Sequence, residues 1–383
     1  MTATTDAASN RRGNLREVAL LFAKLGFIAF GGPAAHVALM RQEVVERRQW
    51  LSEQGFLDLL GASNLIPGPT STELAIYLGY SRAGPLGLVL AGGLFILPAM
   101  LMVLAFAWAY VTFGSTPAAS GLLYGIKPVI LAVVVQAIYG LARTAIKNWL
   151  LGVVVVLTIA IYLAGLNPLI PLFGLSIAFA IARNTFHLRL GLAGVSIVAQ
   201  VSATAAQTFS LTTLFLTFLK IGATLYGSGY VLLAFLHEDF VSRLGWLTDQ
   251  QLLDAVAVGQ FTPGPVFTTA TFIGYILGGL PGAIIATLAI FLPSFLLVAI
   301  VYPFVPRLRA SPWTSAFLDG ANAAAVGLMA AVAWQLAASS IIDPFTAALA
   351  AIAAVVLIRF RVNSVWLVLG GGAAGLATTV LRG

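Results

Sequence analysis

The sequence contains one pattern twice, and the second copy lies 196 residues after the first. Residues 64–69 read Asn-Leu-Ile-Pro-Gly-Pro, and residues 260–265 read Gln-Phe-Thr-Pro-Gly-Pro. Before the Pro-Gly-Pro, further matches have the same separation of 196: residues 22–26 match 218–222, Trp50 matches Trp246 and Asp58 matches Asp254. After it the separation becomes 195, and Gly79 matches Gly274 and Pro98 matches Pro293. Chance does not produce such a series in register, so the chain consists of two homologous halves.

Each half consists mainly of long apolar runs. The chain is 60% hydrophobic and 9% charged, whereas soluble domains carry about 25% charged residues. A helix needs roughly 20 apolar residues to span the hydrocarbon core, and the sequence predicts roughly 10 to 13 membrane segments. The runs are 85–113, 120–142, 149–164 and 168–182, then 281–302, 315–339, 345–358 and 364–381. The predicted fold is therefore an all-α polytopic membrane protein.

Each half also contains a broken helix pair. Pro-Gly-Pro separates short pieces at 56–66 and 70–81, and again at 251–262 and 266–280. These pieces are too short to span, so we predict re-entrant hairpins, although a simple kink is the alternative. The predicted breaks and hinges are Gly31, Gly32, Pro33, Pro67, Gly68, Pro69, Gly227, Gly229, Pro263, Gly264 and Pro265.

The positive charges predict an orientation. The net charge is +7, but the cations lie in short gaps between apolar runs, which indicates membrane topology and excludes a nucleic-acid partner. With the N-terminus in the cytoplasm and 190–210 crossing once, fifteen of the twenty Lys and Arg residues lie inside. The halves then form inverted-topology repeats, as in many secondary transporters. The predicted parts are a disordered cytoplasmic tail at 1–14, a first repeat at 15–189, the connecting segment at 190–210 and a second repeat at 211–383.

Three lysines lie inside apolar runs. Lys24 and Lys220 occupy equivalent repeat positions, and the counterpart of Lys127 is Asn322. A buried ammonium costs several kcal/mol unless it is paired, hydrated or bound to an anion. We predict that these lysines bind an anionic substrate. The alternatives are that Lys24 snorkels to the interface or that a lysine forms a structural ion pair.

The residues around each Pro-Gly-Pro predict an anion site. A half-helix that begins after such a break presents free N–H groups and a favourable dipole. Hydroxyls at these starts can bind an anion or only cap the helix, and the amides that precede the breaks can donate to an oxyanion. The candidate substrate-binding residues here are Asn64, Gln260, Thr70, Ser71, Thr72, Thr268 and Thr269.

The acidic and titratable residues include a candidate for proton transport. Glu73 is the candidate proton carrier, because burial and a nearby lysine shift a carboxyl pKa in opposite directions; a static ion pair is the alternative. Asp58 and Asp254 are interpreted as helix-dipole partners or gate contacts. His36 is interpreted as structural. The chain lacks cysteine and has three histidines, so we predict neither a metal site nor a cofactor, and we predict that the protein is not an enzyme.

The combination of motifs resembles the chromate ion transporter family in its long, two-domain form. Phe30-Gly31-Gly32-Pro33, Trp50-Leu51 and the motif at 64–69 carry the likeness, together with 261–265 and Gly274-Tyr275. The resemblance implies a chromate-resistance antiporter of the bacterial inner membrane, which exports chromate with the proton motive force. Its partners are then the oxyanion, protons and the lipid bilayer, with the oligomeric state, homodimer included, left open.

Other readings remain. Sulfate is a tetrahedral dianion like chromate, so the residues do not choose between them. A passive anion channel would use the same site but would not move the anion uphill. A structural or assembly subunit is disfavoured, because buried lysines without a function would be costly.

Overall fold

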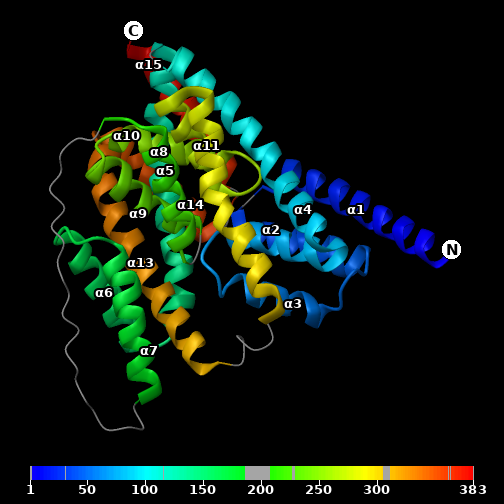
Figure 1. The fold of residues 1–383 in the computed structure, drawn as a ribbon. Helices are drawn as coiled ribbons and strands as arrows, with labels where there is room; N and C mark the ends of the chain where they lie inside the picture. Colours follow the sequence, from blue (N-terminus) through cyan, green and yellow to red (C-terminus); the bar gives the residue numbers. More distant parts are fainter. Residues whose placement is uncertain are drawn as a thin grey trace. The chain divides into compact units, whose positions relative to one another are not determined.

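The computed structural model describes residues 2–30, 32–114, 116–185, 208–226, 229–304, 311–360, 362 and 364–382. Within these ranges the chain forms fourteen α-helices and several short helical turns, and no strand (Figure 1). The chain divides into two compact units, and each unit combines segments from both repeats. Unit one is Met1–Thr112, Ser210–Gly229 and Val258–Arg309; unit two is Phe113–Phe209, Tyr230–Ala257 and Ala310–Gly383.

Unit one contains both Pro-Gly-Pro motifs. Its elements are α1 (Thr2–Ile28), α2 (Gly32–Arg41), η1 (Gln42–Arg47), α3 (Glu53–Ser63), α4 (Thr70–Phe113), α8 (Leu211–Thr224), η5 (Val266–Thr268), α11 (Thr269–Val301) and η6 (Tyr302–Phe304). Ser52 caps α3, since its hydroxyl accepts a hydrogen bond from the Gly55 N–H. The apolar side chains of α1, α2 and α4 form one buried cluster that includes Phe22, Met40 and Tyr77.

Unit two contains the remaining helices. Its elements are α5 (Pro117–Ala145), α6 (Trp149–Leu163), η2 (Ile170–Leu175), α7 (Ser176–Thr185), α9 (Leu232–Leu236), η4 (His237–Arg243), α10 (Asp249–Phe261), α13 (Pro312–Ser340), α14 (Pro344–Phe360) and α15 (Ser364–Arg382), and the turn η3 (Gly229–Val231) joins α9 to the preceding chain. The last turn of α10 belongs to unit one.

The long helices α4 and α11 each contain a sharp reversal. In α4 the backbone leaves the helical region at Ala83 and Gly84, and in α11 it does so at Gly278 and Gly279. Gly84 and Gly279 have φ values of 66° and 60°, which glycine adopts without a steric penalty. Each Pro-Gly-Pro is therefore followed by a short helix (70–82 or 266–277) and then by a long apolar one.

Close glycine contacts hold each reversal together. A Cβ on Gly79 would clash with the Gly87 carbonyl, and a Cβ on Gly274 would clash with that of Gly282. The backbones of the two antiparallel segments therefore touch, as small residues permit in membrane helices. The same contact in both repeats shows that the hairpin is a feature of the repeated unit.

Among the described residues, four helices are long and apolar enough to cross a membrane. They are Thr70–Phe113, Pro117–Ala145, Val266–Phe304 and Pro312–Ser340, and five shorter apolar helices accompany them. The first and third of these contain the reversals, so their spanning parts are the segments after Gly84 and Gly279. This agrees with the predicted runs at 85–113 and 281–302.

In unit two, helices of the first repeat pack against helices of the second repeat. Helix α13 of the second repeat packs on α6 and α7 of the first, while α5 of the first packs on α14 and α15 of the second. A Cβ on Gly320 would clash with Ser176, and a Cβ on the equivalent Gly125 would clash with the backbone of Gly371. Each contact therefore occurs twice with the repeats interchanged, as in an isologous pair.

Two predictions from the sequence need comment. The tail predicted to be disordered at 1–14 is helical from Thr2, because α1 extends from the apolar segment and each added residue gains a hydrogen bond. The connecting segment at 190–210, on which the inverted topology depends, lies outside the described residues up to 207. The hinge residues Gly31 and Gly227 also lie outside them.

The glycine contacts predict which substitutions the hairpins tolerate. Gly274→Leu forces a side chain against the backbone at Gly282, and overpacking of this kind costs about 3 kcal/mol of unfolding free energy. Gly93 in α4 has open space at its Cβ, so Gly93→Leu is the matched control. Thermal unfolding in detergent will show a lowered Tm for Gly274→Leu alone; equal Tm values for both variants would contradict the packing.

Candidate functional site

The two Pro-Gly-Pro loops of unit one are each tied to the first helix of the other repeat. The Gly68 N–H donates to the Leu225 carbonyl at 2.8 Å, and the Gly264 N–H donates to the Ala29 carbonyl at 2.9 Å. Gly68 and Gly264 are equivalent positions, and so are Ala29 and Leu225. The same hydrogen bond is thus made twice with the repeats exchanged, which brings both helix breaks into one unit.

A buried carboxyl lies beside the first loop. Glu73 is 0% exposed, and its Oε1 accepts a hydrogen bond from Ser294 Oγ at 3.3 Å. A Cβ on Gly68 would clash with this Oε1, so the glycine allows the carboxyl to approach the loop backbone. The contact with Ser294 replaces the lysine partner that the ion-pair alternative for Glu73 required.

Polar atoms near Glu73 have no protein partner within the described part of the chain. They are Oε2 of Glu73 itself, Oγ1 of Thr72 and the hydroxyl of Tyr77, all fully buried. Buried polar atoms are nearly always hydrogen-bonded in proteins, so three unpaired polar atoms within two turns of one helix need an explanation. A ligand or water molecules at the start of α4 would satisfy them.

His36 and Ser71 connect this region to the crossing point of the loops. His36 Nδ1 lies 3.1 Å from Ser71 Oγ, and Nε2 lies 3.0 Å from the Ala29 carbonyl. That carbonyl also accepts the hydrogen bond from Gly264. The histidine interpreted as structural therefore links the first half-helix to the second loop, a role that needs a tertiary contact and has no local sequence signal.

The second loop is more self-contained. Thr268 Oγ1 donates to the Pro265 carbonyl and Thr269 Oγ1 donates to the Val266 carbonyl, both at 2.8 Å. These hydroxyls donate to carbonyls three residues earlier and do not cap a helix N-terminus, so the capping alternative is not seen at this loop. The loops therefore differ chemically, and the first one presents more groups for a ligand.

Lys24 has an acidic partner. Its Nζ lies 2.8 Å from Oε1 of Glu43, and the lysine side chain is 47% exposed. Glu43 is buried and also contacts Arg47 and Arg48. The structure thus provides the ion pair that was the alternative for Lys24; the partner was missed because it lies across a turn of the chain.

The remaining candidates of unit one are dispersed. Asn64 follows the last residue of α3 and is exposed. Gln260 is half-buried near the end of α10, and Lys220 is half-buried in α8. Thr70 is half-buried at the first position of α4. Their positions at four different helices do not by themselves assign them a role.

Lys127 of unit two forms a buried ion pair. Its Nζ lies 3.4 Å from Oδ1 of Asp254 on α10, and the two side chains are 15% and 3% exposed. Asp254 was interpreted as a helix-dipole partner or gate contact, and its pairing with Lys127 was not anticipated. Comparison of the repeats gave one indication: Asp254 has an acidic counterpart in Asp58, whereas the counterpart of Lys127 is the uncharged Asn322.

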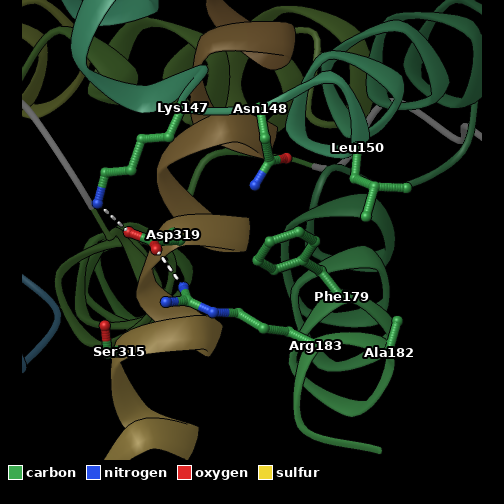
Figure 2. Close-up of a pocket in the computed structure, with 8 residues that line it drawn as sticks. All are labelled: Lys147, Asn148, Leu150, Phe179, Ala182, Arg183, Ser315 and Asp319. Carbon is green, nitrogen blue, oxygen red and sulfur yellow. Dashed lines mark hydrogen bonds and ion pairs between the residues drawn. The ribbon is translucent and has the colours of Figure 1, made fainter. Parts of the chain in front are cut away.

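A second charged site of unit two surrounds Asp319. Lys147 Nζ lies 2.6 Å and Arg183 Nη1 lies 2.7 Å from the two oxygens of this carboxylate. They line a cavity of about 500 Å³ together with Asn148, Leu150, Phe179, Ala182 and Ser315 (Figure 2). The second repeat places Ile342 and Thr378 at the positions of the two cations, so only the first repeat supplies cations of this kind.

The family model "Chromate transporter" matches residues 16–182 and again residues 212–376. The chain belongs to the chromate transporter family. This membership confirms the resemblance in its two-domain form, and with the apolar helices it confirms a multi-pass membrane transporter with two homologous halves. Members of this family are transporters and not enzymes.

Individual relatives agree with this assignment. The "Chromate transport protein" of Cupriavidus metallidurans is 34% identical over 368 residues, which cover 94% of this chain and 92% of the relative. The "Probable chromate transport protein" of Synechococcus elongatus is 34% identical over 341 residues, 86% of either chain. The "Uncharacterized transporter YwrB" of Bacillus subtilis is 27% identical and aligns over 46% of this chain and 88% of its own length. No solved structure matches the chain.

The Lys127–Asp254 pair predicts a stability signature. Lys127→Met removes the cation beside the buried Asp254 carboxylate, and breaking a buried pair by removing one partner costs about 3–5 kcal/mol of unfolding free energy. The double variant Lys127→Met/Asp254→Leu removes both charges and regains most of that loss. Chemical unfolding in detergent measures both values, and an additive double variant would show that the pair does not interact.

Proposed function

We propose that the protein is a secondary active transporter that exports chromate, or a similar tetrahedral oxyanion, from the cytoplasm with the proton motive force. The observation that carries the proposal is the likeness to the chromate transport protein of Cupriavidus metallidurans over 94% of this chain. The broken helices in unit one, with their buried polar groups, supply a physical basis for binding an oxyanion.

The proposed binding site is the start of α4 at the first Pro-Gly-Pro. Its free N–H groups favour an anion, and Ser71 and Thr72 add hydroxyls. A protonated Glu73 donates a hydrogen bond to an oxyanion, whereas an ionised Glu73 repels it, so anion binding and proton binding are linked there. Thr268 and Thr269 at the second loop, Asn64, Gln260 and Thr70 complete the proposed set.

The lysines are proposed to provide the substrate path. Lys24 and Lys220 stand at equivalent positions of the two repeats, and Lys127 is buried in α5 beside Asp254. Glu43 beside Lys24 and Asp254 beside Lys127 can be displaced by a dianion, which carries a higher charge than a carboxylate. Lys24→Ala or Lys220→Ala is then expected to abolish transport while the protein still inserts normally.

The repeats are proposed to have inverted topology, with the N-terminus in the cytoplasm of a bacterial inner membrane. The distribution of Lys and Arg supports this orientation. In unit one and in unit two, contacts recur with the repeats interchanged, which is what a pseudo-two-fold axis between them requires. Alternating access would then rock one repeat against the other around the broken helices.

Everted membrane vesicles test the function directly. Labelled chromate and labelled sulfate are offered outside, with and without a proton gradient. Uphill chromate uptake that an uncoupler abolishes is the expected result. Sulfate uptake alone would change the substrate, flux that only follows the gradient would identify a channel, and no uptake from verified protein would refute the proposal.

Glu73→Gln tests the role of the buried carboxyl. The amide keeps the size and donates hydrogen bonds, but it cannot release a proton. We expect chromate exchange across the membrane to survive and proton-driven accumulation to be lost, because the amide cannot carry a proton. Glu46→Gln, at an exposed glutamate, is the matched control. Normal accumulation in Glu73→Gln would refute the role.

A further inference from the structure

The two repeats contain the same three-residue contact with different chemistry. In the first repeat, the Arg41 guanidinium contacts Glu46 and Glu53. The equivalent positions in the second repeat are His237, Ser242 and Asp249. There, His237 Nε2 lies 3.1 Å from Asp249 Oδ1, and Nδ1 lies 3.5 Å from Ser242 Oγ. The second repeat therefore keeps the arrangement of the contact, but the titratable His237 stands in place of the permanently charged Arg41.

The surroundings of the two contacts differ as well. The Arg41 and Glu53 side chains are 42% and 47% exposed, so water solvates that pair; the hydrogen bond from Arg41 holds the pKa of Glu53 below its usual value. The His237 side chain is 8% exposed. A charge at His237 must therefore be accommodated with far less water, and burial disfavours it.

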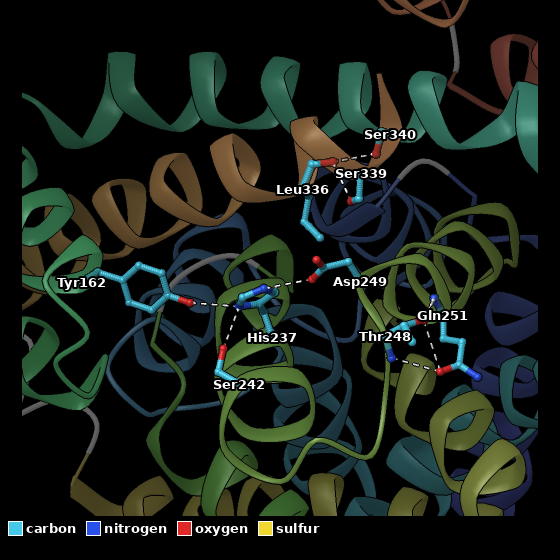
Figure 3. Close-up of polar contacts among 9 residues, drawn as sticks. All are labelled: Tyr162, His237, Ser242, Thr248, Asp249, Gln251, Leu336, Ser339 and Ser340. Atoms are coloured by element: carbon cyan, nitrogen blue, oxygen red, sulfur yellow. Dashed lines mark hydrogen bonds and ion pairs between the residues drawn. The ribbon is translucent and has the colours of Figure 1, made fainter. Parts of the chain in front are cut away.

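Tyr162 completes the contact in the second repeat. Its hydroxyl lies 3.2 Å from His237 Nδ1 (Figure 3). A neutral ring with its proton on Nε2 suits both neighbours, since the Asp249 carboxylate lies beside Nε2 and the Tyr162 hydroxyl can donate to Nδ1. A second proton on Nδ1 would force the Tyr162 hydroxyl to turn. The second repeat has no hydroxyl at the equivalent position, because the counterpart of Tyr162 is Leu357.

The other groups near His237 do not replace these partners. On α13, Ser339 and Ser340 both donate to the Leu336 carbonyl, and at the start of α10 Thr248 and Gln251 bond to each other (Figure 3). Among the described residues, His237 and Asp249 form the contact itself, Glu238 acts electrostatically on Tyr162, and Arg243 contacts Asp239 on η4.

We propose that His237, held between Tyr162 of α6 and Asp249 of α10, is a proton-binding site whose occupancy favours separation of η4 from α10. A group that binds a proton more strongly in one conformation than in another links proton binding to the conformational change. Helix α10 begins at Asp249 and continues to Phe261, immediately before the second Pro-Gly-Pro. The contact thus holds the start of the helix that leads into that break.

The direction of the linkage follows from burial. Burial lowers the pKa of His237 below 6.5, and Asp249 offsets part of this effect. When η4 and α10 separate, water reaches the ring and the pKa returns toward its ordinary value. The separated state therefore binds the proton more strongly. Above pH 6.5 the contact stabilises the packed state of η4 and α10, and this stabilisation is lost as the pH falls through the lowered pKa of His237.

Hydrogen–deuterium exchange of the full-length protein tests this without any transport assay. After correction for intrinsic rates, opening at 249–257 in the wild type is expected to rise between pH 7.5 and pH 5, by about tenfold per unit of pKa difference between the two states. His237→Gln stays neutral and is expected to show pH-independent opening. Arg41→Lys keeps the permanent charge of the first repeat and is the control, with the wild-type profile.

A second variant covers the case in which His237→Gln fails to fold. Tyr162→Phe removes the donor to neutral Nδ1, so the pH response is expected to move to higher pH. Identical pH profiles in the wild type and His237→Gln, or in the wild type and Tyr162→Phe, would overturn the proposal.

Transport measurements then connect the site to the proposed function, on which its role in coupling rests. Chromate exchange without a proton gradient is expected to accelerate in acid in the wild type and to accelerate less in His237→Gln, in which Glu73 still titrates. If the wild type moves neither chromate nor sulfate at any pH, the proposed function fails, while the exchange measurement still decides whether His237 is a proton-binding site.

Discussion

The arrangement of unit one depends on a pair of backbone hydrogen bonds. Each Pro-Gly-Pro interrupts a helix and leaves backbone groups without intrahelical partners, and a membrane offers no water to satisfy them. Gly68 and Gly264 solve this by donating to Leu225 and Ala29, the carbonyls at the helix ends of the opposite repeat. Neither repeat can complete its own break, so the two halves of the chain must fold together.

The symmetric scaffold has asymmetric side chains. Backbone contacts such as those of Gly125 and Gly320 recur in both repeats, whereas the chemically active residues do not. Glu73 is matched by a threonine, Lys127 by Asn322 and Arg41 by His237. A symmetric framework permits two equivalent conformations, and groups present on one side alone are what can make a proton or an anion favour one of them.

Local features of the chain were predictable, and distant pairings were not. The predicted pieces at 70–81 and 85–113 agree with the helices on either side of the reversal in α4, because proline and glycine act on their own backbone. The partners of Lys24 and Lys127 were missed, since Glu43 and Asp254 lie 19 and 127 positions away. A lysine in an apolar run requires a partner, but its sequence does not specify which acid.

The sequence by itself determined the duplication, the membrane environment and the positions of the helix breaks, because repetition, hydrophobicity and the backbone limits of proline and glycine are local properties. Tertiary structure alone decided that both breaks share one unit, that Glu73 faces Ser294 and that His237 lies between Tyr162 and Asp249. These pairings depend on how helices from different repeats pack, and packing depends on the whole set of contacts at once.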